Sequence, residues 1–157
     1  MGDDKDNEAD RGEHEARLVV LRYEPNDSNG LQSAVFSDVS PNPTDEDIAR
    51  GKTVFNNGGH DGVIAIGGGS GMDAGKAISL VGRNDADLWA FDYDQPESPA
   101  LGSESFVPLI CVPTTAGTGA ETESTAMVPD TKRMMKWCVW HPGLKPARVI
   151  LDPELTI

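Results

Sequence analysis

The chain has 157 residues, of which 38% are hydrophobic and 25% charged, a size that fits one domain or a part of a longer protein. Its 26 acidic and 13 basic residues give a formal net charge of −13, which argues against nucleic-acid binding because such a surface repels a phosphate backbone. No apolar run approaches the ~20 residues of a membrane-spanning helix and no basic and apolar leader is visible, so we expect neither a membrane protein nor a secreted one.

The N-terminal segment is rich in charge and poor in apolar side chains, with seven acids and two bases among residues 1–15. Such a segment buries too little apolar surface to offset the entropy of ordering. We therefore expect a disordered acidic tail over residues 1–17 and one folded domain over residues 18–157. Short apolar runs at residues 18–21 and 33–36 predict two strands, because turn-forming residues separate them.

A helix and a buried strand are predicted next. Thr44 and Asp47 have capping-box spacing and predict a helix start, while Gly58 and Gly59 predict its end. Residues 62–66 are continuously apolar instead of alternating in polarity. This pattern is typical of a parallel strand that is covered on both faces.

The strongest local motif is the glycine-rich turn at residues 67–70 (GGGS), which joins that strand to a second predicted helix with Ser70 as N-cap and Asp73 at N3. Glycines let backbone N–H groups approach an anion, and a helix N-terminus adds partial positive charge, so a diphosphate suits the turn. Met72 and Ala77 break the two commonest phosphate-binding patterns. The turn is therefore either a diphosphate site or an ordinary strand-to-helix connection.

A second loop has a similar setting. An apolar strand is predicted over residues 106–112, and residues 114–119 then supply small side chains and three threonine hydroxyls. Hydroxyls bind ribose or phosphate without adding negative charge. Thr118 and Glu121 have capping-box spacing and predict a helix start, so the alternative is that Thr118 only caps this helix while the other two threonines hold the loop.

The order of the elements predicts the fold class. Residues 125–128 and 134–140 predict a hairpin, and residues 148–151 a last strand. Strands that alternate with helices are typical of an α/β fold, an open sheet with a parallel core. Because ligands bind such sheets at the carboxyl ends of the strands, the two loops together favour a dinucleotide site.

Four motifs in this order resemble the iron-containing alcohol dehydrogenase family, over residues 35–157. They are DVSPNPT at residues 38–44, DGVIAIGGGS at 61–70 with Asp73 and Lys76 after it, PTTAGTGAE at 113–121 and VILDPELT at 149–156. The resemblance implies a Rossmann-like domain, similar to the N-terminal domain of dehydroquinate synthases, that binds NAD or NADP. In the family, a helical domain that holds Fe²⁺ or Zn²⁺ follows.

The resemblance also implies which residues bind the cofactor. Gly68, Gly69 and Ser70 would meet the diphosphate, and Asp73 would lie beside the nicotinamide half. The cofactor cleft would be lined by Thr114, Thr115 and Thr118, and the positions near the ribose and adenosine portions would be Asn42 and Lys136. Two of these assignments have plain alternatives. Asn42, between two prolines, also suits a simple turn, and Lys136 also suits a surface position on a strand edge.

Two features of the family are missing. The aspartate that selects NAD over NADP has no identifiable counterpart, so the cofactor preference is left open. The family's metal ligands, an aspartate, a histidine four residues later and two further histidines, lie beyond Leu155. His14 has Asp10 four residues earlier, but both lie in the charged tail with no apolar helix face to orient them, and His60 and His141 have no partners at ligand spacing. We therefore predict no catalytic and no metal-binding residue in this chain, and expect the helical metal domain to be absent from it.

The function predicted from these observations is the cofactor-binding part of an NAD(P)-dependent alcohol dehydrogenase or aldehyde reductase, inactive by itself. Its expected partners are a nicotinamide dinucleotide, a small alcohol or aldehyde in the complete enzyme, and a second copy in a homodimer. The alternative is a non-catalytic nucleotide- or partner-binding module derived from the same family. Cys111 and Cys138 form no C-x-x-C pair, which favours a reducing cytoplasm.

Overall fold

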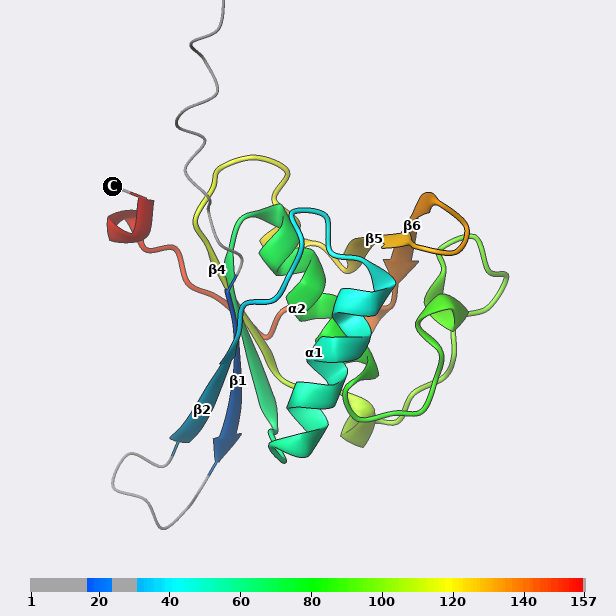
Figure 1. Cartoon of the computed structure of the whole chain (residues 1–157), viewed down its shortest axis with the longest axis horizontal. Coiled ribbons are helices and arrows are strands. Elements are labelled where there is room, and N and C mark those ends of the chain that lie inside the picture. Colours follow the sequence, from blue (N-terminus) through cyan, green and yellow to red (C-terminus); the bar gives the residue numbers. More distant parts are fainter. Residues whose placement is uncertain (1–16, 24–30, 157) are drawn as a thin grey trace, which may run out of the picture.

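The computed structural model describes residues 17–23 and 31–156, so the predicted acidic tail, apart from Arg17, lies outside the described residues. The helices are α1 (Asp45–Asn57) and α2 (Gly69–Val81) (Figure 1). The strands are β1 (Arg17–Tyr23), β2 (Leu31–Phe36), β3 (Gly62–Gly67), β4 (Leu109–Pro113), β5 (Thr125–Asp130), β6 (Met135–Trp140) and β7 (Arg148–Val149). Short 3-10 turns lie between several of them.

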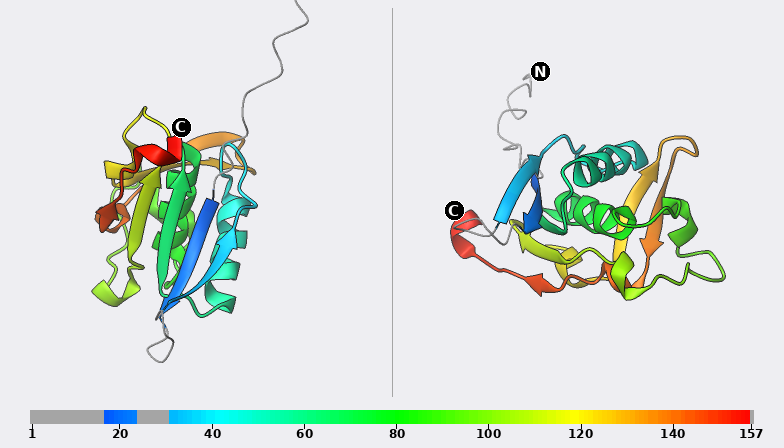
Figure 2. Two further views of the ribbon diagram at one scale, coloured as in Figure 1. Left: turned by 90° about the vertical axis from the view of Figure 1, so that its left-hand side faces the viewer. Right: turned by 90° about the horizontal axis from the view of Figure 1, so that it is seen from below.

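Five strands form one sheet in the order β2-β1-β3-β4-β7, and β5 pairs with β6 in a separate hairpin. The predicted parallel core is confirmed, because β4 runs parallel to both β3 and β7. Figures 1 and 2 show α1 and α2 packed side by side on one face of this sheet, with the β5–β6 hairpin beyond α2. The architecture is therefore the predicted α/β fold.

The first two strands depart from the parallel arrangement. β1 pairs antiparallel with both β2 and β3. A parallel crossover needs about a dozen residues or more. Only residues 24–30 connect β1 to β2, so the short connection permits an antiparallel pair and no crossover helix.

The predicted capping box of α1 is confirmed. The Asp47 backbone N–H donates to Thr44 Oγ1 at 3.3 Å, and the Thr44 N–H donates to Asp47 Oδ2 at 2.8 Å. Ile48 and Phe55 are buried on the inner side of the helix. Gly51 lies where α1 meets α2, since a Cβ built there would come 2.2 Å from Ile78 Cδ1. The two helices therefore approach more closely than a larger residue would permit.

Two predicted strands are shorter than expected. β4 begins at Leu109 and not at residue 106, because a 3-10 turn (Ser103–Ser105) and Pro108, which has no backbone N–H, come before it. β7 covers Arg148–Val149 only, although the Ile150 N–H still donates to the Cys111 carbonyl at 2.9 Å. Neither change alters the order of the strands.

The core lies between the sheet, the two helices and the hairpin. Phe55, Ile78, Leu80, Val63 and Val128 are almost completely buried there. His141 lies at its edge against the rings of Phe91 and Phe106, and its Nδ1 accepts the Gly143 N–H at 3.0 Å. In the described part of the chain, neither helix has the length and apolar character that crossing a membrane would require.

Candidate nucleotide-binding site

The two predicted loops meet at one edge of the sheet. In the register of the parallel pair, Gly67 at the end of β3 lies opposite Pro113 at the end of β4. The Thr114 N–H donates to the Gly67 carbonyl at 2.8 Å, which joins the start of the second loop to the start of the first. Strand pairing therefore brings together two segments that are far apart in the sequence.

The first loop differs from the prediction in its cap. α2 begins at Gly69 with Gly68 as N-cap, so the prediction that Ser70 caps the helix was wrong. The Ser70 hydroxyl instead donates to the carbonyl of Pro41 in the loop before α1. Because Gly68 has no side chain, the first N–H groups of α2 receive no side-chain hydrogen bond, and the first turn contains no acidic residue.

The two glycines at this helix start have different surroundings. A Cβ built on Gly68 would lie 3.2 Å from Thr115 Oγ1, so this glycine allows the second loop to approach α2. A Cβ built on Gly69 would have nothing within 4 Å. The space above Gly69 is therefore open, and backbone N–H groups border it.

The second loop does not lead into the predicted α-helix. Gly119 has a left-handed conformation (φ 73°) and is followed only by a 3-10 turn (Ala120–Thr122), so the helix start expected at Thr118 was wrong. Thr122 Oγ1 donates to the Gly119 carbonyl at 2.8 Å, which closes this turn locally. As a result Thr118 is not a helix cap.

A cavity of about 380 Å³ lies between the start of α2, the second loop and the hairpin. Four of the predicted cofactor-binding residues line it, namely Gly69, Ser70, Asp73 and Thr118. Lys136 lines it as well, although it belongs to β6. The structure thus gathers these five predicted residues around one space, while Thr115 lies beside Gly68 and Thr114 bonds to the end of β3.

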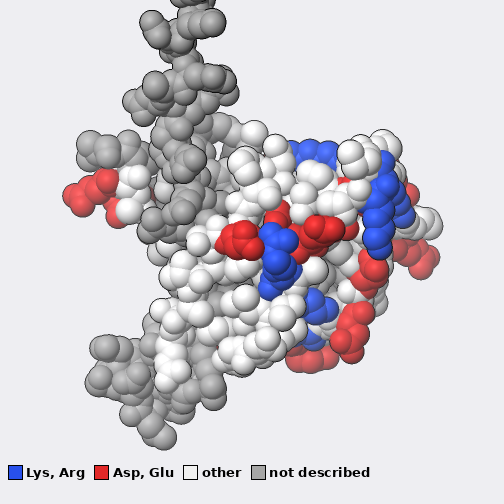
Figure 3. All heavy atoms as spheres, in the orientation of Figure 1, with Lys and Arg blue, Asp and Glu red and all other residues white. Residues whose placement is uncertain are grey.

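Asn42 and Lys136, which are 94 positions apart, also come together. Lys136 Nζ donates to Asn42 Oδ1 at 3.1 Å, so the loop before α1 contacts β6. Both side chains are exposed. Figure 3 shows further blue side chains on this side of the molecule, over the hairpin, where Lys132 and Arg133 are exposed too.

Asp73 is one of three charged side chains in the cavity wall, the others being Glu123 and Lys136. Its partial burial raises the pKa of the carboxyl group, while a hydrogen bond from the Met127 backbone and the charges of Lys76 and Lys136 oppose that rise. The neighbouring Lys76 is completely buried. The sequence analysis assigns Lys76 no role in the site. The sequence feature that could have indicated its burial is its place among the regularly spaced apolar residues of α2.

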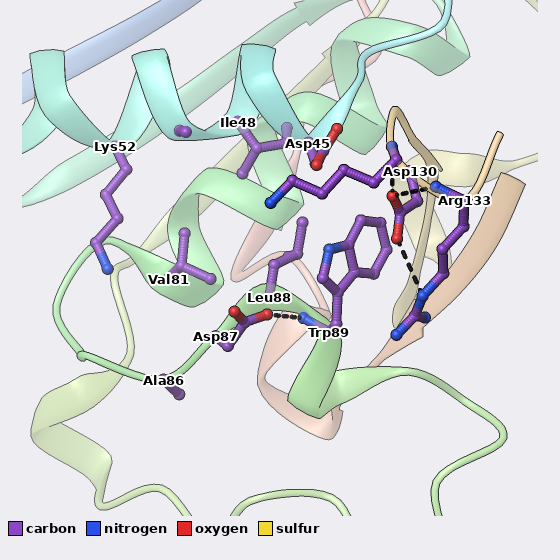
Figure 4. A pocket seen from close by; sticks show the side chains of 12 residues that line it. Asp45, Ile48, Lys52, Val81, Ala86, Asp87, Leu88, Trp89, Asp130 and Arg133 are labelled. Atoms are coloured by element: carbon purple, nitrogen blue, oxygen red, sulfur yellow. Dashed lines mark hydrogen bonds and ion pairs between the residues drawn. The ribbon is translucent and has the colours of Figure 1, made fainter. Parts of the chain in front are cut away.

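A second cavity, of about 360 Å³, lies between α1, the segment that follows α2 and the turn of the hairpin (Figure 4). Its acidic groups already bond to the backbone, since Asp87 accepts the Trp89 N–H at 2.8 Å and Asp130 accepts the N–H of Lys132 at 2.8 Å. Lys52 in its wall donates to the Asn84 carbonyl at 2.8 Å. These contacts hold loops in place, and the cavity contains none of the predicted site residues.

Comparison with known proteins identifies the family. The family model described as iron-containing alcohol dehydrogenase matches residues 10–153. The chain belongs to this family. It is 38% identical over 128 residues to the NAD-dependent methanol dehydrogenase of Bacillus methanolicus, a match that covers 82% of this chain and 32% of that protein. It is 35% identical over 129 residues to the 4-hydroxybutyrate dehydrogenase of Cupriavidus necator, a match that covers 82% of this chain and 33% of that protein.

A solved structure supports the same membership. Sulfoacetaldehyde reductase from Bifidobacterium kashiwanohense, crystallised in complex with NAD⁺, superposes with a TM-score of 0.69 and 31% identity, over 77% of this chain and 31% of that one. The chain thus spans about a third of the length of the curated family members that it matches.

The metal of the family has no site in the described part of the chain. Within residues 17–23 and 31–156, no three His, Cys, Asp or Glu side chains are grouped so as to hold a metal ion. His141 bonds to the backbone near Gly143. The described residues therefore do not fit the family metal.

Proposed function

We propose that this chain binds NAD or NADP across the glycine-rich turn, as the cofactor-binding part of an NAD(P)-dependent alcohol dehydrogenase or aldehyde reductase. The observation that carries the proposal is the start of α2, where backbone N–H groups without a side-chain cap border open space over Gly69. Two of the matched proteins support it, because one is named as NAD-dependent and another was crystallised with NAD⁺.

The diphosphate group fits the start of α2 for electrostatic reasons. α2 has 13 residues and no acidic side chain in its first turn, so its N-terminus presents a partial positive charge that no carboxylate of that turn offsets, although Asp73 and Glu123 also line the cavity. This local field matters because the chain as a whole carries a net charge of −13 and repels anions at long range. Lys136, across the cavity, adds a second positive charge.

The remaining residues of the cavity would orient the cofactor. The hydroxyl of Thr118 and the carboxylate of Asp73 offer hydrogen-bond partners to ribose hydroxyls or to the amide of a nicotinamide. A bound nicotinamide dinucleotide supplies the hydride-accepting carbon for alcohol oxidation. For the complete enzyme, the proposal includes small alcohols or aldehydes as substrates, Fe²⁺ or Zn²⁺ as the metal, and assembly as a homodimer.

Fluorescence titration with NADH tests the binding of the cofactor. We expect saturable binding by the 157-residue chain and no reduction of NAD⁺ by added alcohols, since the described residues provide no metal site. Lack of NADH and NADPH binding by the folded chain would contradict the proposal. Alcohol-dependent turnover by this chain alone would contradict the view that it is only the cofactor-binding part.

A glycine variant locates the bound diphosphate. Gly69→Ala adds a methyl group into space that is open in the free chain, so the stability should hold while NADH affinity falls about tenfold or more, because a close backbone contact is lost. Gly102→Ala is the matched control, because its new Cβ meets only the side chain of Glu104, before β4 and at the other end of the sheet. Equal NADH affinity of the Gly69→Ala variant and the wild type would place the diphosphate elsewhere.

A further inference from the structure

Lys76 is the only lysine or arginine that is buried in the described part of the chain, and its exposed fraction is 0%. It lies in the middle of α2, two turns after the glycine-rich start. Its ammonium group donates to the carbonyl oxygens of Ala120 and Thr125, the latter at 3.0 Å. Burying a charge is expensive unless it is hydrogen-bonded and compensated, so this placement requires a reason.

The two acceptors connect the lysine to the cavity. Ala120 opens the 3-10 turn after the second loop, and Thr125 begins β5. Both residues line the 380 Å³ cavity, as do Gly69 and Asp73 from α2. One ammonium group therefore joins the helix that carries the first loop to the opposite wall of the same cavity.

The surroundings of the ammonium group act on its pKa in opposite directions. Burial lowers the pKa of Lys76, and four nearby acidic groups oppose that shift, namely Asp73 on α2, Cys111 on β4 when it is a thiolate, and Glu123 and Glu121 after the second loop. Burial also raises the pKa of Cys111 to about 11, so this neighbour is a neutral thiol over most of the alkaline range.

We propose that Lys76 is a positioning residue, which fixes the spacing between the glycine-rich turn and the second loop so that a dinucleotide fits between them. The inference rests on the proposed function, because it assigns a role within the same site. It is distinct from packing alone. A side chain that only filled space would serve equally well without a charge, whereas a clamp requires the two hydrogen bonds to Ala120 and Thr125.

The first test needs no cofactor. Lys76→Met keeps an apolar stem of similar length but cannot donate, and Lys76→Arg keeps both charge and donors. We expect amide hydrogen exchange at residues 118–125 to accelerate in Lys76→Met and to stay near the wild-type rate in Lys76→Arg. Lys52→Met is the matched control, because Lys52 also donates to a backbone carbonyl, that of Asn84, away from the cavity. Unchanged exchange at residues 118–125 in Lys76→Met would overturn the proposal.

The second test measures NADH affinity. Lys76→Met should weaken binding about tenfold or more, in line with the loss of hydrogen bonds from a charged group, while Lys52→Met stays within about twofold. In the wild type, affinity should decline at alkaline pH, because burial lowers the pKa of Lys76 and a neutral amine forms weaker hydrogen bonds than an ammonium group. Lys76→Arg should remove most of this decline, since arginine stays charged.

The outcomes separate the two proposals. If the wild type does not bind NADH, the proposed function fails, and the exchange experiment still decides whether Lys76 holds the loop. If Lys76→Met does not fold, the wild-type and Lys76→Arg pH profiles decide instead. Equal pH profiles in these two proteins, or a wild-type affinity that does not change with pH, would overturn the positioning role.

Discussion

The crossing of α1 and α2 gives a sharp quantitative prediction, because two opposing effects meet at Gly51. Glycine inside a helix costs about 0.8–1 kcal/mol relative to alanine, so Gly51→Ala should stabilise the chain if propensity were the only factor. The structure opposes this gain, since the new Cβ would lie 2.2 Å from Cδ1 and 2.8 Å from Cγ1 of Ile78.

The steric effect should win at this position. Ile78 is completely buried, and the Phe36 ring would be only 3.2 Å from the new Cβ, so neither neighbour has room to withdraw. Overpacking of a core costs about 1–3 kcal/mol. After the gain in helix propensity, we expect Gly51→Ala to lower the free energy of unfolding by up to about 2 kcal/mol.

Urea denaturation followed by tryptophan fluorescence measures this change. Ile78→Val removes Cδ1, the atom of closest approach, at a cost of about 0.5–1.5 kcal/mol by itself. In that background Gly51→Ala should be clearly less harmful, and the double-mutant cycle should give a favourable coupling energy. A more stable Gly51→Ala variant, or strict additivity with Ile78→Val, would refute the close approach of the two helices.

Two further predictions concern the cap of α1 and the edge of the core. Thr44→Ala removes the side-chain half of the capping box and should lower the free energy of unfolding by about 1 kcal/mol in urea denaturation, whereas no change would show that Asp47 alone holds the helix start. Burial lowers the pKa of His141 below its ordinary value of 6.5, against a raising effect from a hydrogen bond to the Pro99 backbone, so the unfolded chain binds a proton more readily than the folded chain. Its contribution to stability is therefore complete above about pH 6.5 and is lost as the pH falls below that value, and His141→Asn should remove this part of the pH dependence of thermal unfolding.

The elements that the sequence predicted correctly depend on local patterns. Thr44 and Asp47 predicted the start of α1 because a capping box lies within four residues, and the apolar run in β3 predicted a buried parallel strand. The direction of β1 was harder to predict. It follows from the short connection to β2, a matter of chain length between strands and not of the residues within them.

The errors at the site arise where a side chain has a distant partner. Ser70 and Asp73 have capping-box spacing, but the Ser70 hydroxyl bonds to Pro41, 29 positions away, and the helix starts earlier. The burial of Lys76 likewise depends on carbonyl oxygens 44 and 49 positions further along the chain. Spacing within a motif contains no information about such tertiary contacts, so the residue types were found while their partners were not.

The uncapped start of α2 has a thermodynamic consequence for the free chain. Its leading amides receive no hydrogen bond from a capping side chain, so an anion seated there would complete the helix and be coupled to folding. By mass action, a ligand at a hundredfold excess over its dissociation constant adds about 2.7 kcal/mol to the free energy of unfolding. The resistance of this small protein to heat would then track the concentration of its dinucleotide.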